Sequence, residues 1–586
     1  MICLIRPPAV ESFRFATTSI TPPIGIAYIA AAIEESGRDV FVIDAVGKRP
    51  KIRVGYFKGY LVGMDLDEIV DHIPPESKII GVTVVFTHEW PAVVRLVGLI
   101  KKAYPDVRVV LGGEHVTAMP EFSLATSLAD FVVMGEGEET VIELLDAVEN
   151  GGDVLDITGI AFRTSGGVHV NPRRARRTDI DSIPRPAWHH FDLKSYHAHR
   201  FVGGMYSEKL TVPILATRGC PYQCTYCASP EMWSPRWIPR DPILVVDEIQ
   251  SYVEDYEAGN FPFQDLTAII QKDWIVTFCT EIINRGLKIT WLLPTGTRSE
   301  AIDREVAELL RDSGMVSMAY APESGSETTR RLIKKRMKTE TLFESIRAAN
   351  ASRLNVAIFL VIGFPHDSRE SLEENIAFID HIAREGVKDL SVGFYMALPG
   401  TELFHTLFDS GKIRLDRAYF RHILDSSSLL PSQSYTENIG VLELAMCKLK
   451  MFLRFYGPRN RRHNKRFHES SLLSEIVNGL NIKSHQSRLQ TALRNGMGSA
   501  WITLACSLKA GWIRRSEEHR MFDDWDRIYG FIRKAKVTGD VVQRFPSDSR
   551  ELHKRNIIHV LRSEQTQSYE VKLQPLNSIN CDCVTD

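Results

Sequence analysis

The first 150 residues alternate short apolar runs, rich in β-branched residues, with longer stretches whose apolar residues recur at helical spacing. The apolar runs cover residues 40–43, 79–86, 107–111 and 131–134, and the helical stretches cover 25–36, 92–103 and 139–149. Strands that alternate with crossover helices are typical of a doubly wound parallel sheet, which binds ligands outside the carboxyl ends of its strands. We therefore expect an α/β domain over residues 1–150.

A second series of strands and helices begins at Thr211, with expected strands at 212–217, 289–293, 316–320, 355–362 and 390–394. The segment 173–186, which precedes it, is rich in Arg, Pro and Asp, and we place a linker over 151–205. Repeated strand-helix units favour a partial or full (β/α) barrel over 206–425, whose functional site lies at the C-terminal ends of its strands.

The last part of the chain changes to a mainly helical pattern. Residues 441–456 and 499–512 carry apolar residues at helical spacing. We expect a helical C-terminal region over 426–565 and a flexible tail over 566–586. The basic run at 459–466 offers contacts to phosphate, but we interpret it as a solvated face.

Length and composition narrow the class of protein. A chain of 586 residues exceeds one hydrophobic core, and 44% hydrophobic with 25% charged residues is typical of globular proteins. The net charge of -2 by itself names no partner, and we expect no nucleic-acid partner. No signal peptide and no run of about 18 apolar residues is present, so we expect a cytoplasmic protein without a transmembrane segment.

Three of the nine cysteines lie within eight residues, which points to a metal site rather than a disulfide scaffold. Cys220, Cys224 and Cys227 have the spacing C-x3-C-x2-C directly after an expected strand. Three thiolates hold three irons of a [4Fe-4S] cluster and leave the fourth open to chelate an amino-carboxylate. The alternatives are a zinc site, completed by His189 or His190 through folding, and three unrelated buried cysteines.

This motif, with an aromatic residue before its last cysteine, resembles the signature of the radical S-adenosylmethionine (SAM) superfamily. Segments 263–267, 298, 323–326, 363–365 and 398–401 resemble later features of that family, whereas Ala321 and the pair Asp367-Ser368 depart from its usual residues. The resemblance implies SAM contacts from Tyr226, Arg298, Glu323, Ser324 and Gly363. Arg298 can pair with the SAM carboxylate and Glu323 can accept a ribose hydroxyl. A structural salt bridge stays the alternative for either residue.

The N-terminal part resembles the flavodoxin/Rossmann-like cobalamin-binding domain that precedes many radical SAM barrels. The segments that carry this likeness are 22–30, 112–117 and 135–138. The implied cofactor-binding residues are Pro23, Gly25, Thr87, His88, Gly112, Gly113, His115, Gly135, Glu136 and Gly137. An Asp-x-His-x-x-Gly cobalt-ligating motif is absent, so His88 is either a cobalt ligand or a spacer beneath the corrin. His115 is expected to bond the cofactor's tail or the turn itself. A sheet that has lost its cofactor is the alternative.

The resemblance implies a cobalamin-dependent C-methyltransferase that acts on an unactivated carbon of a small-molecule or peptide biosynthetic intermediate, through methylcobalamin and a 5'-deoxyadenosyl radical. Its electron donor would be a flavodoxin or ferredoxin. One alternative is a cyclase or rearrangement enzyme similar to the oxidative cyclase of anaerobic bacteriochlorophyll synthesis. The others are a non-catalytic cobalamin or redox sensor and a transfer-RNA methylthiolase. The last usually carries several N-terminal cysteines, whereas Cys3 is alone there.

The other cysteines receive simpler interpretations. Cys279, Cys447 and Cys506 lie in apolar contexts and are expected in cores. Cys581 and Cys583 are interpreted as an incidental pair near the chain end. No residue is identifiable as a general base.

Overall fold

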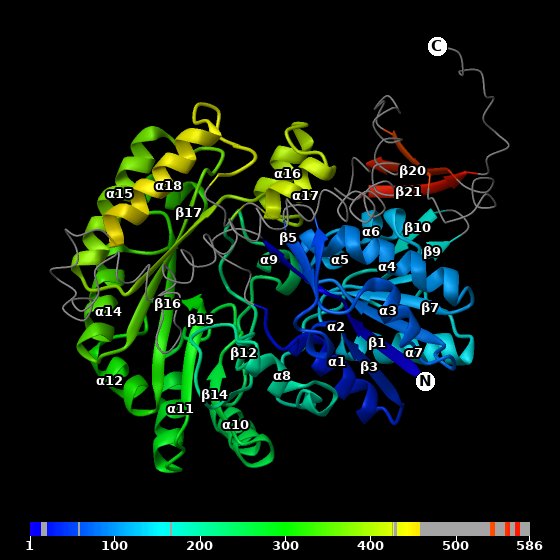
Figure 1. The fold of residues 1–586 in the computed structure, drawn as a ribbon, viewed down its shortest axis with the longest axis horizontal. Helices are drawn as coiled ribbons and strands as arrows, with labels where there is room; N and C mark the ends of the chain where they lie inside the picture. Colours follow the sequence, from blue (N-terminus) through cyan, green and yellow to red (C-terminus); the bar gives the residue numbers. More distant parts are fainter. Residues whose placement is uncertain are drawn as a thin grey trace.

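The computed structural model describes residues 1–12, 20–56, 59–164, 167–424, 426 and 430–456, and three strands between residues 540 and 574. Two sheets dominate it (Figure 1). The first, built mainly from the blue and cyan part of the chain, lies beside the second, which is green. Within the described part of the chain, no helix is long and apolar enough to cross a membrane.

The first sheet has the doubly wound core that the sequence predicts. Its parallel strands lie in the order β8, β7, β6, β1, β3, with bounds Phe131–Val133, Arg108–Gly112, Ile79–Thr83, Ile2–Arg6 and Val40–Asp44. Helices α1 (Ile24–Glu35), α4 (Trp90–Ala103) and α7 (Glu138–Asn150) pack on it. These strands are mostly buried, which is why they read as near-continuous Val, Ile and Leu.

Shorter elements complete this half of the molecule. They are β2 (Ala9–Ser12), α2 (Ala45–Lys48), β4 (Arg53–Tyr56), β5 (Gly59–Val62), α3 (Leu66–Asp71), η1 (Thr87–Glu89), α5 (Glu114–Ala118) and α6 (Pro120–Thr126). Strands β9 (Ile160–Thr164) and β10 (Gly167–Val170) add an antiparallel hairpin to the first sheet. This hairpin lies inside the range assigned to the linker. Segment η2 (Trp188–His190) and α8 (Leu193–Ala198) follow.

The second sheet is a partial barrel of six parallel strands. In order they are β11 (Leu210–Thr211), β14 (Ala258–Pro262), β15 (Thr290–Thr297), β16 (Met315–Glu323), β17 (Asn355–Ile362) and β18 (Asp389–Phe394). The edge strands β11 and β18 do not pair with each other, so among the described strands the barrel stays open. This settles the choice between a partial and a full barrel.

Helices cover the outer side of the partial barrel, and three others, α9 (Ser229–Trp233), α16 (Glu402–Asp409) and α17 (Arg417–Leu424), lie between the barrel and the first sheet (Figure 1). The bounds of the remaining helices are α10 (Pro242–Tyr256), α11 (Lys272–Asn284), α12 (Arg304–Asp312), α13 (Glu327–Leu332), α14 (Thr339–Ala351), α15 (Arg369–Arg384) and α18 (Val441–Tyr456). Helix α18 has the bounds that the apolar spacing predicts.

One expected strand is wrong. The strand expected at 212–217 is divided, because β11 ends at Thr211 and β12 (Thr217–Arg218) pairs instead with β13 (Ile238–Pro239). Three strands were not expected: β19 (Asp540–Arg544) and β20 (Ile557–Arg562) in the mainly helical region, and β21 (Tyr569–Gln574) in the tail, all of which join the first sheet. Strand pairing with β10 is a tertiary effect that local periodicity does not reveal.

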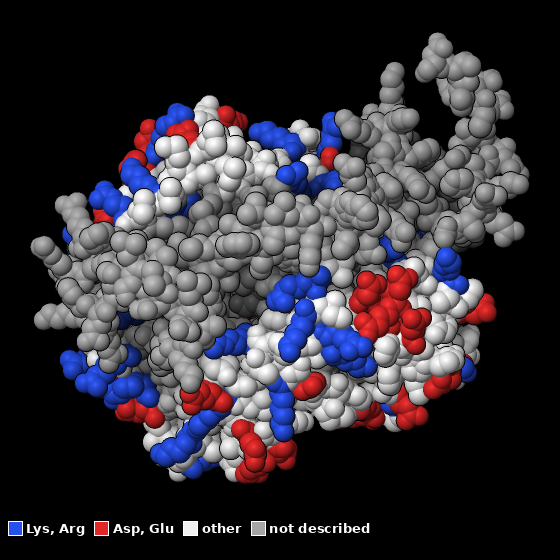
Figure 2. Space-filling model, in the orientation of Figure 1, with Lys and Arg blue, Asp and Glu red and all other residues white. Residues whose placement is uncertain are grey.

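The remaining expectations for the C-terminal region, the helix at 499–512, the basic run at 459–466 and Cys506, Cys581 and Cys583, lie outside the described residues. Cys279 and Cys447 are buried, as expected. One apolar core runs from the first sheet into the barrel and includes Leu4 and Ile26 on one side and Phe261 and Trp291 on the other. On the face drawn in Figure 2, basic and acidic side chains are interspersed over the described surface.

Candidate functional site

The loop that carries the three clustered cysteines is fixed at its start by a buried carboxylate. Asp265, after β14, accepts hydrogen bonds from the backbone N–H of Ala216 at 3.2 Å and from the hydroxyl of Thr217 at 2.7 Å. Its side chain also accepts the N–H of Thr217. The loop therefore leaves β12 in one orientation, toward the C-terminal ends of the barrel strands.

The thiols of Cys220, Cys224 and Cys227 are neighbours but do not surround one point. Burial, with smaller contributions from the other two thiols, raises the pKa of Cys227 to about 12. Three thiolates on one Zn²⁺ would lie about 3.8 Å apart, given zinc–sulfur bonds of about 2.3 Å. Among described His, Cys, Asp and Glu side chains, the one group whose ligand atoms all lie within 4.8 Å of one another contains none of these cysteines. This favours a cluster, in which each thiolate binds a different iron, over a single zinc ion.

The histidines considered for a zinc site lie elsewhere. His189 and His190 contact Glu34 of α1, at 3.0 and 2.8 Å, and not the cysteine loop. Cys3 is buried in the core of the first sheet, where burial raises its pKa to about 12. Neither histidine is therefore placed to complete a zinc site at the cysteine loop.

A polar group links the cysteine loop to the end of β16. The ammonium of Lys335 lies 3.2 Å from the carboxylate of Glu323 and 3.4 Å from the hydroxyl of Tyr226. Glu323 is buried and has φ +65°, a left-handed conformation that is strained for a residue with a side chain. The barrel thus holds Glu323 and Tyr226 side by side, and their contacts to SAM stay a prediction. Lys335 carried no sequence signal.

Arg298 reaches the same loop from the end of β15. Its guanidinium lies 4.1 Å from the ring centre of Tyr222, between the first two cysteines, and it donates hydrogen bonds to Glu300 and to the carbonyl of Arg336. The structural salt bridge left open by the sequence is therefore present. Its position beside the cysteine loop also suits an anionic group, and SAM binding by Arg298 stays a prediction.

The turns after β16 and β17 are organised by side chains that accept backbone N–H groups. Asp367 accepts from Gly363 at 2.8 Å and from Phe364 at 3.0 Å. Asn375 accepts from Ser324 at 3.2 Å and from the next backbone N–H at 2.6 Å. Asp367, at a departure from the family's usual residues, thus shapes the turn at Gly363. Ser324 is fully buried and supports its own turn.

In the first half of the molecule, the expected cofactor residues gather at the carboxyl ends of the parallel strands. Pro23 and Gly25 begin α1, and Gly25 is exposed with open space around its Cα. Gly112 ends β7, and Gly113 follows with φ +119°. A Cβ on Gly113 would lie 2.5 Å from the carbonyl oxygen of Val84, so only glycine fits this turn. This edge is where an open α/β sheet presents ligands.

Two buried histidines stand at this edge with unused nitrogens. His115 Nδ1 lies 3.2 Å from the hydroxyl of Thr87, and the ring of His88 stacks on Phe86 at 5.3 Å. Burial lowers the pKa of His88 to about 4 and that of His115 to about 3, so both rings are neutral. Neither Nε2 has a hydrogen-bond partner among the described residues. A neutral imidazole with an orphaned nitrogen suits a bound cofactor, by coordination or by hydrogen bonding.

The turn at 135–138 connects the two halves of the molecule. Gly135 N–H donates to Thr117 at 3.0 Å. The carboxylates of Glu136 and Glu138 bind the buried guanidinium of Arg218 at 3.2 and 2.6 Å. Gly137 lets α7 approach α1, because a Cβ there would lie 2.9 Å from Ile29. The side chain of Glu136, expected to contact cofactor, is thus engaged by the arginine that precedes the cysteine loop.

A cavity of about 260 Å³ lies between the two sheets. One side is formed by Arg6, Phe86, His88 and Glu89, and the other by residues at the barrel mouth, Gln264, Pro294 and Thr295, with Ala9, Val10, Ile20, Thr21 and Gly203 between them. Burial raises the pKa of Glu89 to about 7, opposed by Arg6 and the N–H of Phe86. Sequence reasoning missed Glu89, Arg6 and Gln264, because their neighbours come from distant parts of the chain.

Comparison with known proteins identifies both halves. Residues 15–145 match the B12 binding domain, and residues 214–379 match the radical SAM superfamily. The cytidylyl-2-hydroxyethylphosphonate methyltransferase of Streptomyces wedmorensis is 26% identical over 71% of this chain and 84% of its own. The anaerobic magnesium-protoporphyrin IX monomethyl ester cyclase of a Synechocystis species is 30% identical over 56% of this chain and 61% of its own.

A solved structure shares the fold. The radical SAM methyltransferase TsrM of Kitasatospora setae, determined with cobalamin and a [4Fe-4S] cluster bound, superposes with a TM-score of 0.56 at 17% identity over 70% of this chain and 78% of its own. At that identity the likeness concerns the fold alone. Together with the two domain matches, it agrees with the order of sheet, partial barrel and helices described above. The chain therefore belongs to the cobalamin-dependent radical SAM enzymes, with cobalamin, SAM and a [4Fe-4S] cluster as its cofactors.

Proposed function

We propose that this enzyme methylates an unactivated carbon of a small-molecule or peptide biosynthetic intermediate. The main support for this proposal is the cavity between the two sheets. It is bounded by the expected cobalamin edge on one side and by the mouth of the barrel on the other. A substrate in this cavity would lie between the two cofactors. Holding reactants close and excluding water supplies much of the catalysis in such reactions.

Side chains of this protein hold and orient the cofactors and the substrate. When bound, the cluster and SAM supply a carbon radical that removes a hydrogen atom, and cobalamin supplies the methyl group. We propose that Cys220, Cys224 and Cys227 hold the cluster and that Arg298 and Glu323 orient SAM. His88 would contact the corrin, either as a cobalt ligand or as a spacer, because it lines the cavity and its ring Nε2 has no partner among the described residues. Glu89 is placed in the same cavity to hold or move a proton.

The relatives of this chain support methylation, but they also include enzymes of the alternative class, the cyclases. The Streptomyces relative is a methyltransferase, and the Synechocystis relative is a cyclase. A cyclase or rearrangement enzyme would use the same cofactors without transferring a methyl group. The two reactions differ in what happens to SAM, and this difference is measurable before the substrate is known.

The test uses the full-length protein, reconstituted anaerobically with iron, sulfide and hydroxocobalamin, then given SAM carrying a labelled methyl group and a low-potential reductant that replaces the flavodoxin or ferredoxin donor. We expect S-adenosylhomocysteine to form in a burst that matches the bound cobalamin, with the label retained on the protein-bound corrin. 5'-Deoxyadenosine should form more slowly by uncoupled cleavage.

Substitution of one cysteine separates the two uses of SAM. Cys224→Ala should abolish 5'-deoxyadenosine formation and lower the iron content, whereas Cys279→Ala, which changes a buried cysteine on α11, should retain both. Formation of 5'-deoxyadenosine without any S-adenosylhomocysteine would replace the methyltransferase proposal with the cyclase or rearrangement reaction.

A further inference from the structure

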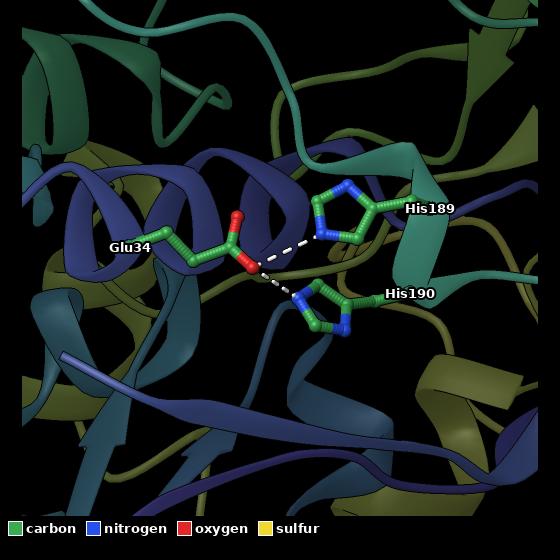
Figure 3. A group of neighbouring side chains, drawn as sticks. All are labelled: Glu34, His189 and His190. Carbon is green, nitrogen blue, oxygen red and sulfur yellow. Dashed lines mark hydrogen bonds and ion pairs between the residues drawn. The ribbon is translucent and has the colours of Figure 1, made fainter. Parts of the chain in front are cut away.

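A second cluster of potential metal ligands lies away from both cofactor sites. Glu34, at the C-terminal end of α1, faces His189 and His190 on the short segment η2 (Figure 3). The carboxylate oxygen Oε1 lies 3.0 Å from Nε2 of His189 and 2.8 Å from Nε2 of His190. Both rings thus point their Nε2 atoms at one oxygen, although the histidines lie more than 150 residues away in sequence.

The backbone around these histidines is held firmly against α1. The N–H of Ala187 donates to the carbonyl of Ala27 at 3.0 Å. Trp188 is fully buried and packs edge-on against Phe191, with 5.9 Å between ring centres. This anchoring fixes where η2 lies on α1, so the two imidazoles are presented from a rigid platform.

The separations suit a metal ion. The three ligand atoms lie within 4.8 Å of one another, and no other group of three described side chains does so. Imidazole nitrogen and carboxylate oxygen bind Zn²⁺ at about 2.0–2.2 Å, which places tetrahedral ligands about 3.3 Å apart. Each of the two oxygen–nitrogen separations needs to increase by only a few tenths of an ångström to reach this value.

We propose that Glu34, His189 and His190 form a binding site for a divalent late transition metal of the Zn²⁺ type, which joins helix α1 to the segment that follows the first sheet. Two imidazoles and one carboxylate select zinc, nickel or copper over magnesium or calcium, which prefer all-oxygen sites. The His189 side chain is 58% exposed, so water completes the coordination.

Ion binding replaces the two hydrogen bonds to Glu34. Because a carboxylate only accepts, each Nε2 carries a hydrogen in the present arrangement. When the metal binds, each Nε2 hydrogen moves to Nδ1 of the same ring or to solvent, which frees the Nε2 lone pair for the ion. The site shares no residue with the cysteine loop or with the cavity, so its occupancy is separable from that of the cofactors.

The test is a titration of tag-free, cofactor-loaded enzyme with ZnCl₂, followed by calorimetry and by metal analysis after gel filtration. We expect one zinc per chain beyond the iron and cobalt of the cofactors. His190→Gln and Glu34→Gln should each weaken binding by at least about tenfold, the loss typical of removing even an indirect contact to a metal. His381→Gln is the matched control, because His381 pairs with Glu385 at 3.4 Å without a third ligand.

Two further measurements make the result decisive. X-ray absorption at the zinc edge should show nitrogen and oxygen neighbours at about 2.0–2.1 Å, whereas zinc in the cysteine loop would show sulfur at about 2.3 Å. Zinc should also raise the melting temperature of the native protein and of His381→Gln, but not that of His190→Gln. Equal zinc affinity in all four proteins, or a sulfur shell, would overturn the proposal.

Discussion

At the scale of single residues, Glu89 is a buried carboxyl group that faces the cavity between the sheets. Burial raises its pKa from 4.5 to about 7, despite the nearby Arg6 and a hydrogen bond from the N–H of Phe86. A raised pKa means that the folded protein holds a proton that the unfolded chain releases above pH 4.5. The contribution of Glu89 to stability is therefore fully present below pH 4.5 and is lost as pH rises through 7.

Glu89→Gln should remove this pH dependence. The variant keeps the size of the side chain but cannot ionise, so it should be more stable than the native protein at pH 8 by roughly 2–3 kcal/mol, and about equal to it near pH 4.5. Melting temperatures of the cofactor-free protein across this range measure the difference. Glu305→Gln, at a position whose side chain is 85% exposed, is the control. A constant offset between native protein and Glu89→Gln at all pH values would contradict the assignment.

At the scale of elements, Asp265 connects the strand before the cysteine loop to the rest of the barrel. It accepts two backbone N–H groups and one hydroxyl from residues 216–217. Asp265→Asn replaces one acceptor oxygen with an NH₂ group, which then faces donors. We expect a loss of about 2–3 kcal/mol in the free energy of unfolding, since a buried donor is left unsatisfied. We also expect a lower iron content after reconstitution, because the loop loses its fixed start.

The control for this change is Asp273→Asn, in the exposed first turn of α11, where the carboxylate interacts only with the helix end. It should cost less than about 1 kcal/mol. Denaturant unfolding gives the free energies, and iron and sulfide analysis gives the cluster content. Full iron content in Asp265→Asn would show that the loop is positioned without this carboxylate.

At the scale of the whole molecule, a buried ion pair joins the two halves. Arg218, which precedes the cysteine loop, binds Glu138 at the start of α7 and Glu136 beside it. The arginine side chain is 5% exposed. Burial raises the pKa of Glu138, but the guanidinium outweighs it, and the pKa is lowered overall. Removing Glu138 leaves the buried guanidinium with Glu136 alone, so the expected cost is part of the about 3–5 kcal/mol typical of a buried charge left fully unpaired.

Glu138→Gln should therefore lower the melting temperature strongly and divide a single calorimetric transition into two, because the halves lose an electrostatic contact. Glu139→Gln, at the adjacent position with a 47% exposed side chain, should change stability by less than about 1 kcal/mol. Scanning calorimetry of both variants measures the melting temperatures and the number of transitions. Identical melting curves would mean that the apolar core alone joins the two halves.

Elements whose signal is local could be predicted well. The helix at 441–456 and the strand at 355–362 have the bounds expected from apolar spacing. The divided strand at 212–217 could not be predicted, because it depends on distant residues. Residues 216–218 bind Asp265 and pair with β13 instead of continuing in the barrel sheet. The strands between 540 and 574 likewise join the first sheet by pairing with the edge strand β10, and this pairing leaves no local pattern in the sequence.

The sequence by itself determined the two α/β halves and singled out the three clustered cysteines as predicted cluster ligands, because periodicity and short spacing are properties of neighbouring residues. Only the tertiary structure decided that Arg218 binds Glu138, that Lys335 joins Tyr226 to Glu323, that Glu89 faces the barrel mouth, and that Glu34 meets His189 and His190. These contacts join residues from different elements, and their geometry follows from how sheets and helices pack. The spacing of residues along the chain does not reveal that packing.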